Sequence, residues 1–328
     1  MARNATNTLL QKAKNSKSDE FYTQISDIES ELQYYKSHFK DKVVYCNCDD
    51  PRTSNFYKYF FSHFKELGLK KIITACYRKQ TFDLFHNKEE EHGFFLEYTG
   101  NKVDHDNAGY TDIVHFKGDG DFRSSESIEL LKQADIIVTN PPFSLFREFV
   151  NQLVKYNKQF LIIGNINAIT YKEIFKLIQE NKAWLGTNLG RGISGFIVPD
   201  HYELYGTEAR IDDFGNRIIS PNNCLWLTNI DNSKRHEDIE LTKRYFGNEN
   251  EYPKYDNYDG INVNNTQDIP ADYMGYMGVP ITFLHKFNPD QFEIIKFRKG
   301  NDEKDLAING KCPYFRILIK NKRIPAEK

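Results

Sequence analysis

The feature of this sequence that most restricts its fold is a series of short apolar runs separated by stretches with helical periodicity. The runs are rich in Val and Ile and end in polar residues or Gly, and they occupy 42–46, 71–75, 136–139 and 160–164. Short runs of branched side chains are typical of strands buried on both faces. Because they alternate with helical stretches, the sequence predicts an α/β fold, a mostly parallel sheet with helices on both faces.

The stretches between the runs carry helix signals. We expect helices over 54–67, 124–133, 144–156 and 171–181. Gly68 is a typical stop for the first helix, and Ser124 a typical cap for the second. Right-handed crossovers bring the carboxyl ends of parallel strands to one edge of the sheet, where ligands bind. The sequence therefore predicts a ligand site at that edge.

After about residue 182 the chain becomes rich in Gly, Asn, Asp and Tyr. Residues 212–216 are typical of a hairpin tip. Further strands are expected over 223–228, 280–284, 291–297 and 313–320. Long loops separate these segments, and such loops in a compact protein tend to be functional. The second half is therefore predicted to be β-rich and loop-rich.

Composition excludes several classes of protein. Of the 328 residues 39% are hydrophobic and 27% charged, as in an ordinary soluble globular protein. No apolar run of about 18 residues is present, and the N-terminus lacks the apolar core of a signal peptide. The five Cys are scattered, which fits free thiols in a reducing cytoplasm, and we predict no metal site. The net charge is −2, with basic residues gathered at both ends, where they would contact phosphates or serve only solubility.

The run at 136–139 leads directly into Asn140-Pro141-Pro142-Phe143, and a helical pattern follows. Two prolines fix two φ angles and remove two backbone donors, and Asn140 is pushed into extended geometry because it precedes a proline. The expected result is a rigid turn that presents the Asn140 amide, the Pro141 carbonyl and the Phe143 ring. Two acceptors and a ring would receive a flat group bearing an amine. The alternative is a plain turn at the end of a core strand.

Asn140-Pro141-Pro142-Phe143 resembles the signature of the N6-adenine DNA methyltransferases, which use S-adenosylmethionine and have a Rossmann-like fold. The resemblance implies that the Asn140 side-chain oxygen and the Pro141 carbonyl accept the two N6 hydrogens. It also implies that Phe143 stacks on a target adenine flipped out of double-stranded DNA. No catalytic Cys is required.

Two further stretches resemble elements of the same family, in the family's order. Phe21, Tyr22 and Thr23 belong to an "EFYT"-like element, which implies contact with the methionine part of the cofactor. Asp121 and Phe122 belong to a "GDF"-like element, whose Asp accepts a hydrogen bond from the cofactor's adenine amine. Taken singly, Phe21 and Tyr22 are also compatible with core positions, and the second element with an ordinary Gly/Asp turn.

The sequence departs from the family pattern after the first two strands. No glycine follows the first strand; Asp49 and Asp50 stand at its end and are expected to bind the cofactor's amino group or ribose, unless they form a solvated turn. The acid that usually follows the second strand is missing, and residues 75–78 read Ala-Cys-Tyr-Arg. These positions are the least determined part of the predicted cofactor site.

The resemblance extends over essentially the whole chain to type II modification methylases that methylate the inner adenine of GAATTC. It implies a cytoplasmic monomer that acts on double-stranded DNA in a restriction-modification system. Three parts are expected: a basic tail over 1–18, a cofactor-binding catalytic core over 19–184, and sheet completion with DNA target recognition over 185–328.

The residues that read DNA cannot be located by pattern alone. Arg191, in a Gly-rich stretch, and the pair Asn222 and Asn223 are candidates, against a mobile loop and a closed turn as alternatives. Asn165 and Asn167 follow a predicted strand and would line the target pocket or serve structure. The alternative functions are methylation of RNA adenine or of a protein glutamine, and a non-catalytic DNA-binding subunit.

Overall fold

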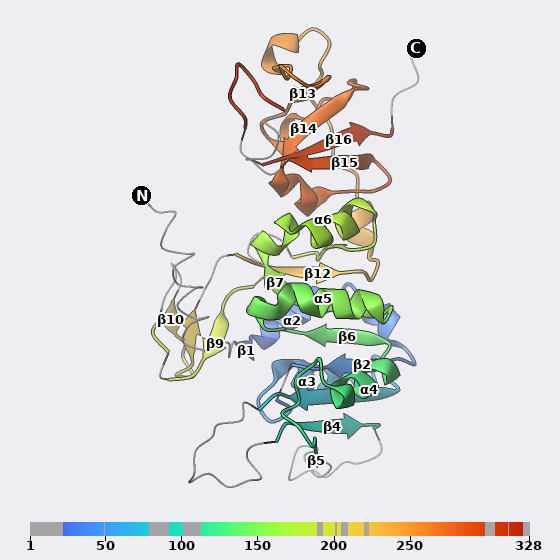
Figure 1. The fold of residues 1–328 in the computed structure, drawn as a ribbon, viewed down its shortest axis with the longest axis vertical. Helices are drawn as coiled ribbons and strands as arrows, with labels where there is room; N and C mark the ends of the chain where they lie inside the picture. The colour runs from blue at the N-terminus through green and yellow to red at the C-terminus, as the bar shows by residue number, and fades with distance from the viewer. Residues whose placement is uncertain are drawn as a thin grey trace. The chain divides into compact units, whose positions relative to one another are not determined.

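The computed structural model describes residues 22–48, 50–78, 92–100, 113–188, 193–200, 202–204, 209–219, 223–298, 306–313 and 315–323. The chain divides into two compact units (Figure 1). The first unit comprises Met1–Ala168 and Asn188–Ile230, and the second Ile169–Thr187 and Asp231–Lys328. The predicted basic tail over 1–18 lies outside the described residues.

The core of the first unit is a parallel sheet. Its central strands are β2 (Val43–Cys46), β3 (Lys71–Cys76), β6 (Ile136–Thr139) and β7 (Gln159–Asn165), in the order β3-β2-β6-β7. All three pairings between these neighbours are parallel. Each strand lies within one residue of its predicted range, and every residue of β2 and β6 is buried. The predicted buried parallel sheet is confirmed.

Antiparallel strands extend this sheet at both edges. β4 (Phe94–Tyr98) pairs with β3, and β5 (Ile113–His115) pairs with β4. On the other side β12 (Cys224–Thr228) pairs with β7, as expected for a strand near 223–228. β5 was not predicted, because its side chains are largely exposed and form no buried apolar run.

Helices cover both faces of the sheet because successive strand side chains point to opposite sides. The first unit's helices are α2 (Ile25–Leu32), α3 (Asn55–Ser62), α4 (Ser125–Gln133) and α5 (Phe146–Lys155). Buried residues of α2 and α3 share a cluster with Val44, Ile136 and Leu161. On the opposite face α5 packs so closely that a Cβ on Gly164 would lie 2.5 Å from the Phe146 ring.

The local signals explain where two of these helices begin. The side chain of Ser54 accepts a hydrogen bond from Tyr57 N, and that of Ser124 accepts one from Ser127 N, so both act as N-caps. The first helix ends at Ser62, earlier than predicted, and turns carry the chain to Gly68, whose φ of +62° fits a stop. The helix predicted over 144–156 begins only after a short 3-10 turn.

A second, small sheet completes the first unit. It contains β1 (Tyr22–Thr23), β9 (Phe196–Val198), β10 (Arg210–Ile211) and β11 (Arg217–Ile219), in the order β1-β9-β11-β10. Figure 1 labels β1, β9 and β10 of this sheet, and β11 lies between β9 and β10. The predicted hairpin tip at 212–216 joins β10 to β11 and is confirmed.

The second unit combines helix α6 (Lys172–Gln179) with a four-stranded sheet. Its strands are β13 (Gly260–Asn262), β14 (Tyr276–Pro280), β15 (Phe292–Arg298) and β16 (Arg316–Asn321), in the order β13-β14-β16-β15; the unit also holds β8 (Trp184–Leu185). Helix α6 lies against β15, with the rings of Phe175 and Phe297 stacked at 4.7 Å. The helix and the two last strands were predicted.

The strand predicted over 280–284 is wrong. β14 ends at Pro280, and Ile281–Lys286 forms a 3-10 helix. Phe283 and Leu284 are neighbours and both are buried, which a strand with alternating side chains does not allow against one core. The remaining 3-10 helices are Lys36–Phe39, Phe143–Leu145, Ile166–Thr170, Ser233–His236, Glu249–Glu251 and Thr266–Asp268. Across the described ranges no helix has the length and apolarity that a membrane crossing requires.

Candidate active site

The Asn-Pro-Pro-Phe corner stands at the carboxyl end of β6, a central strand of the sheet. Thr139 is the last strand residue, and the chain then turns at the two prolines into a 3-10 turn, closed by a bond from Leu145 N to Pro142 O of 3.0 Å. Pro141 is buried, whereas Asn140, Pro142 and Phe143 are half-buried. The corner therefore reaches the surface at the edge where a parallel sheet binds its ligands.

The Phe143 ring is supported by the small sheet. Its centroid lies 6.2 Å from that of Phe196 on β9, and the two rings meet edge to face at 64°. Phe196 is fully buried, while Phe143 keeps part of its surface open. This arrangement holds the exposed ring in place without covering it, as a stacking platform requires.

The small sheet also brings the EFYT-like element to this edge. Thr23 pairs with Phe196, and its carbonyl accepts a hydrogen bond of 2.8 Å from the Asn55 side chain. Asn55 is the first residue of α3, which follows β2. Tyr22 is half-buried and Thr23 buried. Strand β1 therefore contacts β9, which carries Phe196, on one side and the N-terminus of α3 on the other. Phe21 lies outside the described residues.

At the end of β2, Asp50 is held by two arginines. Its carboxylate accepts hydrogen bonds from Arg52 Nε at 2.9 Å and Arg52 Nη2 at 2.6 Å, and Arg78 Nη2 lies 3.5 Å away. Burial alone would raise the pKa of Asp50, but the hydrogen bonds and charges of these arginines outweigh it and hold the pKa below its usual value. Asp50 is therefore an ionised part of an ordered turn. Asp49 lies outside the described residues.

The GDF-like turn is fixed against the end of β3 by a glycine. Gly120 has a φ of +78°, and a Cβ there would lie 2.7 Å from the carbonyl oxygen of Cys76. Asp121 follows, and its carboxylate accepts bonds from the backbone and guanidinium of Arg123, which lower the pKa of the carboxyl. Arg123 also pairs with Glu148 on α5. The turn thus presents an ionised carboxylate beside the β3 end.

The side chain of Phe122 is buried against helix α5. It is 5% exposed and packs edge to face on Phe149 of α5, with ring centroids 5.1 Å apart. Its carbonyl accepts a bond from the Gln152 side chain. The ring therefore anchors the GDF-like turn in the core.

Tyr77 occupies the position after β3 where the family's usual acid is missing. It is 50% exposed. Burial, together with the charges of Asp119 and Asp121, raises the pKa of its hydroxyl. The next residue, Arg78, donates its backbone N–H to Asp119 O. Sequence reasoning recorded this position only as a departure and did not identify the half-exposed ring.

The asparagines after β7 belong to the same edge. Asn165 accepts a bond from Asn167 N, and it pairs with Cys224 on β12. The carbonyl of Asn223 accepts a bond of 2.6 Å from Ile166 N, and the buried Asn223 Oδ1 has no hydrogen-bond partner among the described residues. The structure therefore places Asn223 beside the end of β7. The other candidate DNA readers, Arg191 and Asn222, lie outside the described residues.

Asn55 and Phe196 were not singled out from the sequence. The capping pattern at Ser54 locates the helix that carries Asn55, so this residue had a detectable signal. Phe196 had none, because its role depends on the antiparallel pairing of β9 with β1 and β11, which are far apart in the chain.

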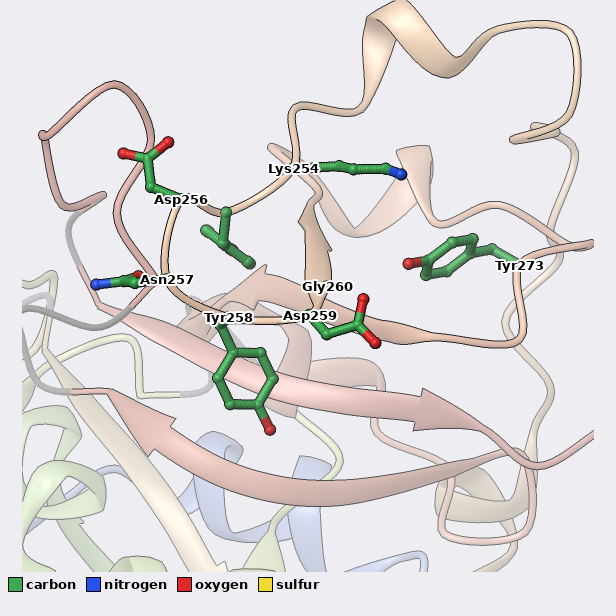
Figure 2. A pocket seen from close by; sticks show the side chains of 8 residues that line it. Lys254, Asp256, Asn257, Tyr258, Asp259, Gly260 and Tyr273 are labelled. Carbon is green, nitrogen blue, oxygen red and sulfur yellow. The ribbon is translucent and has the colours of Figure 1, made fainter.

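The second unit contains a separate polar pocket of about 450 Å³ (Figure 2). Residues 254–260 form most of its lining, and Tyr273 completes it. None of the predicted site residues lines this pocket, so the candidate catalytic residues all belong to the first unit.

A mostly parallel sheet covered by helices, with an Asn-Pro-Pro-Phe corner at its carboxyl edge, is the arrangement of an amino-group methyltransferase. The chain belongs to the family described as adenine-specific methyltransferase EcoRI, which matches residues 9–322. It is 70% identical to the type II methyltransferase M.EcoRI of Escherichia coli, over 99% of both chains. It is 39% identical to M.MpnI of Mycoplasma pneumoniae and 37% identical to M.MgeORF184P of Mycoplasma genitalium, in each case over 95% of this chain and 98% of the relative.

No solved structure matches the chain. The family and the relatives together establish an adenine-specific DNA methyltransferase of the type II class, the modification enzyme of a restriction-modification system.

Proposed function

We propose that the chain transfers a methyl group from S-adenosylmethionine to N6 of an adenine flipped out of double-stranded DNA. The observation that carries this proposal is the half-buried corner at the end of β6, with the Phe143 ring supported edge to face by Phe196. A flipped base needs a ring to stack on and acceptors for its exocyclic amine. The corner offers both at one place.

The residues at the sheet edge fit the cofactor. The carboxylate of Asp121 and the half-exposed ring of Tyr77 offer an acceptor and a flat surface, which suit an adenine ring bearing an amine. Tyr22 and Thr23, with Phe21, would contact the methionine part, and Asp50, with Asp49, the amino group or ribose. When bound, S-adenosylmethionine supplies an electrophilic methyl group on a sulfonium sulfur.

The protein's own contribution is to position and activate the amine. In the proposed complex the Asn140 side-chain oxygen and the Pro141 carbonyl oxygen accept the two N6 hydrogens. Both bonds favour a nitrogen whose lone pair is localised and points out of conjugation with the ring. Pro142 keeps the corner rigid, so the acceptors need no reorganisation during the reaction.

Two cysteines of the sheet, Cys76 and Cys224, are poorly suited to act as nucleophiles. Burial raises the pKa of the Cys76 thiol to about 12 and raises that of Cys224 as well. Both thiols are therefore neutral near pH 7, and a neutral thiol is a poor nucleophile. This fits direct attack by the amine.

The proposed target is the inner adenine of GAATTC, with Arg191, Asn222 and Asn223 among the residues that contact DNA and residues 185–328 contributing recognition. The proposal is supported by the 70% identity to M.EcoRI over nearly the whole chain. The protein is further proposed to act as a monomer in the bacterial cytoplasm, which sedimentation of the protein with and without a DNA duplex would test.

The experiment that tests the function exposes a plasmid with several GAATTC sites to the protein and S-adenosylmethionine, and then maps N6-methyladenine at single-base resolution. Methylation only at the inner adenine of GAATTC is expected. A control plasmid in which each site reads GATATC should stay unmodified. Methylation of single-stranded RNA or of a protein glutamine in preference to duplex DNA, or DNA binding without any transfer, would contradict the proposal.

A further inference from the structure

The sheet of the second unit carries an uneven distribution of charge. The described residues of 291–323, which include β15 and β16, hold seven Lys or Arg and one acid, Glu293. In the same unit the stretch 231–275 holds ten Asp or Glu and five Lys or Arg. Positive charge is therefore concentrated around two strands of the unit. None of the residues assigned to the reaction above accounts for this surplus.

Two lysines of these strands lie on the same face of the sheet. Lys296 is opposite Leu318 in the register of β15 and β16, and Lys320 follows Leu318 by two residues. Because side chains alternate along a strand, these three residues share a face. The opposite face holds Ile317 and Ile319, which are fully buried. Both lysines are half-buried, so part of each side chain is open to solvent.

Each of these lysines lies over a tyrosine ring. Lys296 Nζ is 5.5 Å from the ring centroid of Tyr258, and Lys320 Nζ is 5.9 Å from that of Tyr276. The two rings meet edge to face, with their centroids 5.9 Å apart. The rings hold the long lysine side chains in place, so the ammonium groups lose less conformational freedom when they bind an anion. We call these four side chains the lysine–tyrosine face.

The one acid of this region lies beside the lysine–tyrosine face. Glu293 is exposed and stands opposite Lys320 in the register. Directly opposed residues have Cβ atoms about 4.5–5.5 Å apart, so the carboxylate weakens the attraction of Lys320 for an anion. Two neighbouring arginines are engaged elsewhere, since Arg298 is buried and donates to Pro313 O, and Arg323 pairs with Asp238.

We propose that the lysine–tyrosine face binds the phosphate backbone of the DNA substrate, in a contact that does not depend on base sequence. This inference rests on the proposed action on double-stranded DNA. A lysine ammonium is a compact point charge that suits a phosphate, whereas bases are read mostly by groups that make paired hydrogen bonds. The lysines lie over the tyrosine rings, so the rings do not offer an open platform for stacking an unpaired base. The chemistry therefore favours a duplex backbone over a single strand.

The test measures the DNA affinity of the double variant Lys296→Gln/Lys320→Gln over a range of salt concentrations. One duplex contains GAATTC and a second duplex of equal length does not. The loss of two phosphate contacts should make the slope of log K against log salt shallower by roughly 1.8, at about 0.9 for each contact. Near 0.1 M salt the affinity for both duplexes should fall by the same factor, about ten- to a hundredfold. The DNA concentration that gives half-maximal methylation should rise accordingly.

Three further variants separate charge from folding. Lys296→Arg/Lys320→Arg keeps both charges and should retain the wild-type salt slope. Glu293→Gln removes the acid opposite Lys320 and should tighten binding to both duplexes, a gain that damage to the fold cannot produce. Lys176→Gln/Lys182→Gln removes the same charge from the same unit at lysines that pair with Glu180, and it should bind DNA like the wild type.

An unchanged salt slope in Lys296→Gln/Lys320→Gln would overturn the inference. So would a loss of affinity confined to the GAATTC duplex, which would make the face a reader of sequence, or an equal loss in Lys176→Gln/Lys182→Gln, which would reflect only the total charge. A larger loss for single-stranded DNA than for the duplex would assign the face to unpaired bases instead. If the wild type binds neither duplex, it is the proposed action on double-stranded DNA that fails.

Discussion

The rings of Phe143 and Phe196 meet edge to face at 6.2 Å, which couples two parts of the chain with different roles. Phe143 ends the rigid corner after β6, and Phe196 sits in β9, between β1 and β11. The same small sheet therefore supports the stacking ring, carries Thr23 to the N-terminus of α3, and displays the hairpin tip. Its pairing positions residues that are more than 100 positions apart in the sequence.

Shortening the supporting ring should lower activity more than stability. Phe196→Leu keeps an apolar side chain in the core, so we expect a loss of about 1–2 kcal/mol in the free energy of unfolding. The Phe143 ring loses its edge-to-face partner, and its orientation becomes less defined. Single-turnover methylation should fall about tenfold at saturating DNA, since misplacement near the reacting atoms is costly.

Phe160→Leu is the matched control for this change. Phe160 is also a buried aromatic, 1% exposed, but it lies near the start of β7, away from the carboxyl edge. It should lose similar stability in chemical denaturation and keep its methylation rate. If both variants lose activity equally, Phe196 supports only the fold.

Removing the acceptor at the corner should abolish transfer and leave binding intact. In Asn140→Ala one of the two proposed acceptors is lost, and the loss of one oriented polar group in an active site typically costs about 10²–10³ in rate. Asn140 is half-buried at the surface edge, so unfolding should change little. Radiolabelled methyl transfer and a gel-shift assay on the same duplex would measure the two properties separately.

The activity of Asn140→Ala decides whether the Asn140 side chain takes part in the reaction as a hydrogen-bond acceptor. A variant that methylates at the wild-type rate would show that the Asn140 side chain is not an acceptor. Loss of DNA binding in parallel with activity would show instead that the corner shapes the binding surface.

The sheet could be predicted from the sequence because its signal is local. Buried parallel strands need unbroken apolar runs, and 136–139 and 160–164 provide them without reference to the rest of the chain. The N-caps at Ser54 and Ser124 are equally local. The pattern failed at 280–284, where apolar neighbours indicated a strand and the chain instead forms a 3-10 helix that buries Phe283 and Leu284 together.

The surroundings of the corner could not be predicted in the same way. The contact of Phe143 with Phe196 depends on long-range pairing, for which no short pattern exists. The sequence marks Tyr77 only as the absence of an acid, because the surroundings of this residue depend on how the Gly120 turn packs on the end of β3. Phe122 matched a motif, yet its ring is in the core, since a motif does not specify the direction of a side chain.

Adding a methyl group at Gly120 should damage the cofactor site. Gly120→Ala is strained by its φ of +78° and by a contact of 2.7 Å with the carbonyl of Cys76. We expect a loss of about 1–3 kcal/mol in stability and a higher KM for S-adenosylmethionine, because Asp121 must move. Equilibrium dialysis with labelled cofactor would measure the weaker binding directly.

Gly247→Ala separates the two sources of strain. Gly247 also has a positive φ, of +92°, but nothing lies within 4 Å of the added Cβ. This variant should lose only the backbone contribution and bind cofactor normally. If both variants bind the cofactor with equal affinity, the Gly120 turn does not belong to the cofactor site.

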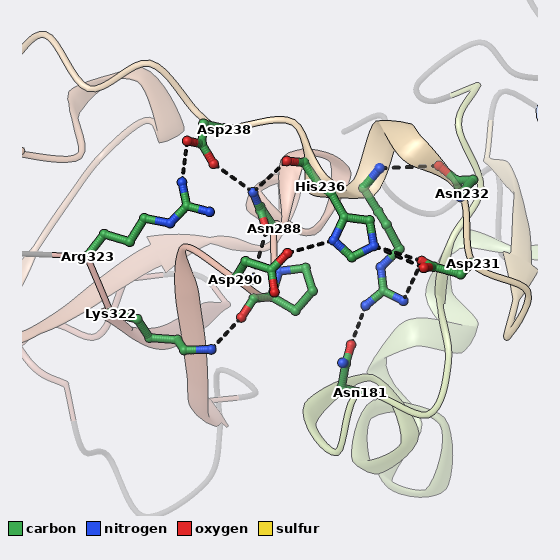
Figure 3. Close-up of polar contacts among 11 residues, drawn as sticks. Asn181, Asp231, Asn232, His236, Asp238, Asn288, Asp290, Lys322 and Arg323 are labelled. Atoms are coloured by element: carbon green, nitrogen blue, oxygen red, sulfur yellow. Dashed lines mark hydrogen bonds and ion pairs between the residues drawn. The ribbon is translucent and has the colours of Figure 1, made fainter.

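A histidine in the second unit should make stability depend on pH. His236 lies between two carboxylates, with Nδ1 2.6 Å from Asp290 and Nε2 2.9 Å from Asp231 (Figure 3). Both ring nitrogens can donate only in the imidazolium form. The hydrogen bonds that His236 donates to Asp290 and Asp231 therefore raise the pKa of His236, while the charges of Lys322 and Arg323 help to lower the pKa of Asp290.

Because the folded-state pKa is raised, the stabilisation is complete below the unfolded pKa of about 6.5 and disappears as pH rises through the folded value. His236 and its two carboxylate partners are exposed to solvent, so the charge of His236 should contribute at most about 1 kcal/mol to the free energy of unfolding. His236→Gln should thus melt about 1–3 °C below wild type at pH 6 and match it at pH 9. A constant difference in melting temperature between the variant and the wild type across the pH range would mean that the His236 charge contributes nothing to stability.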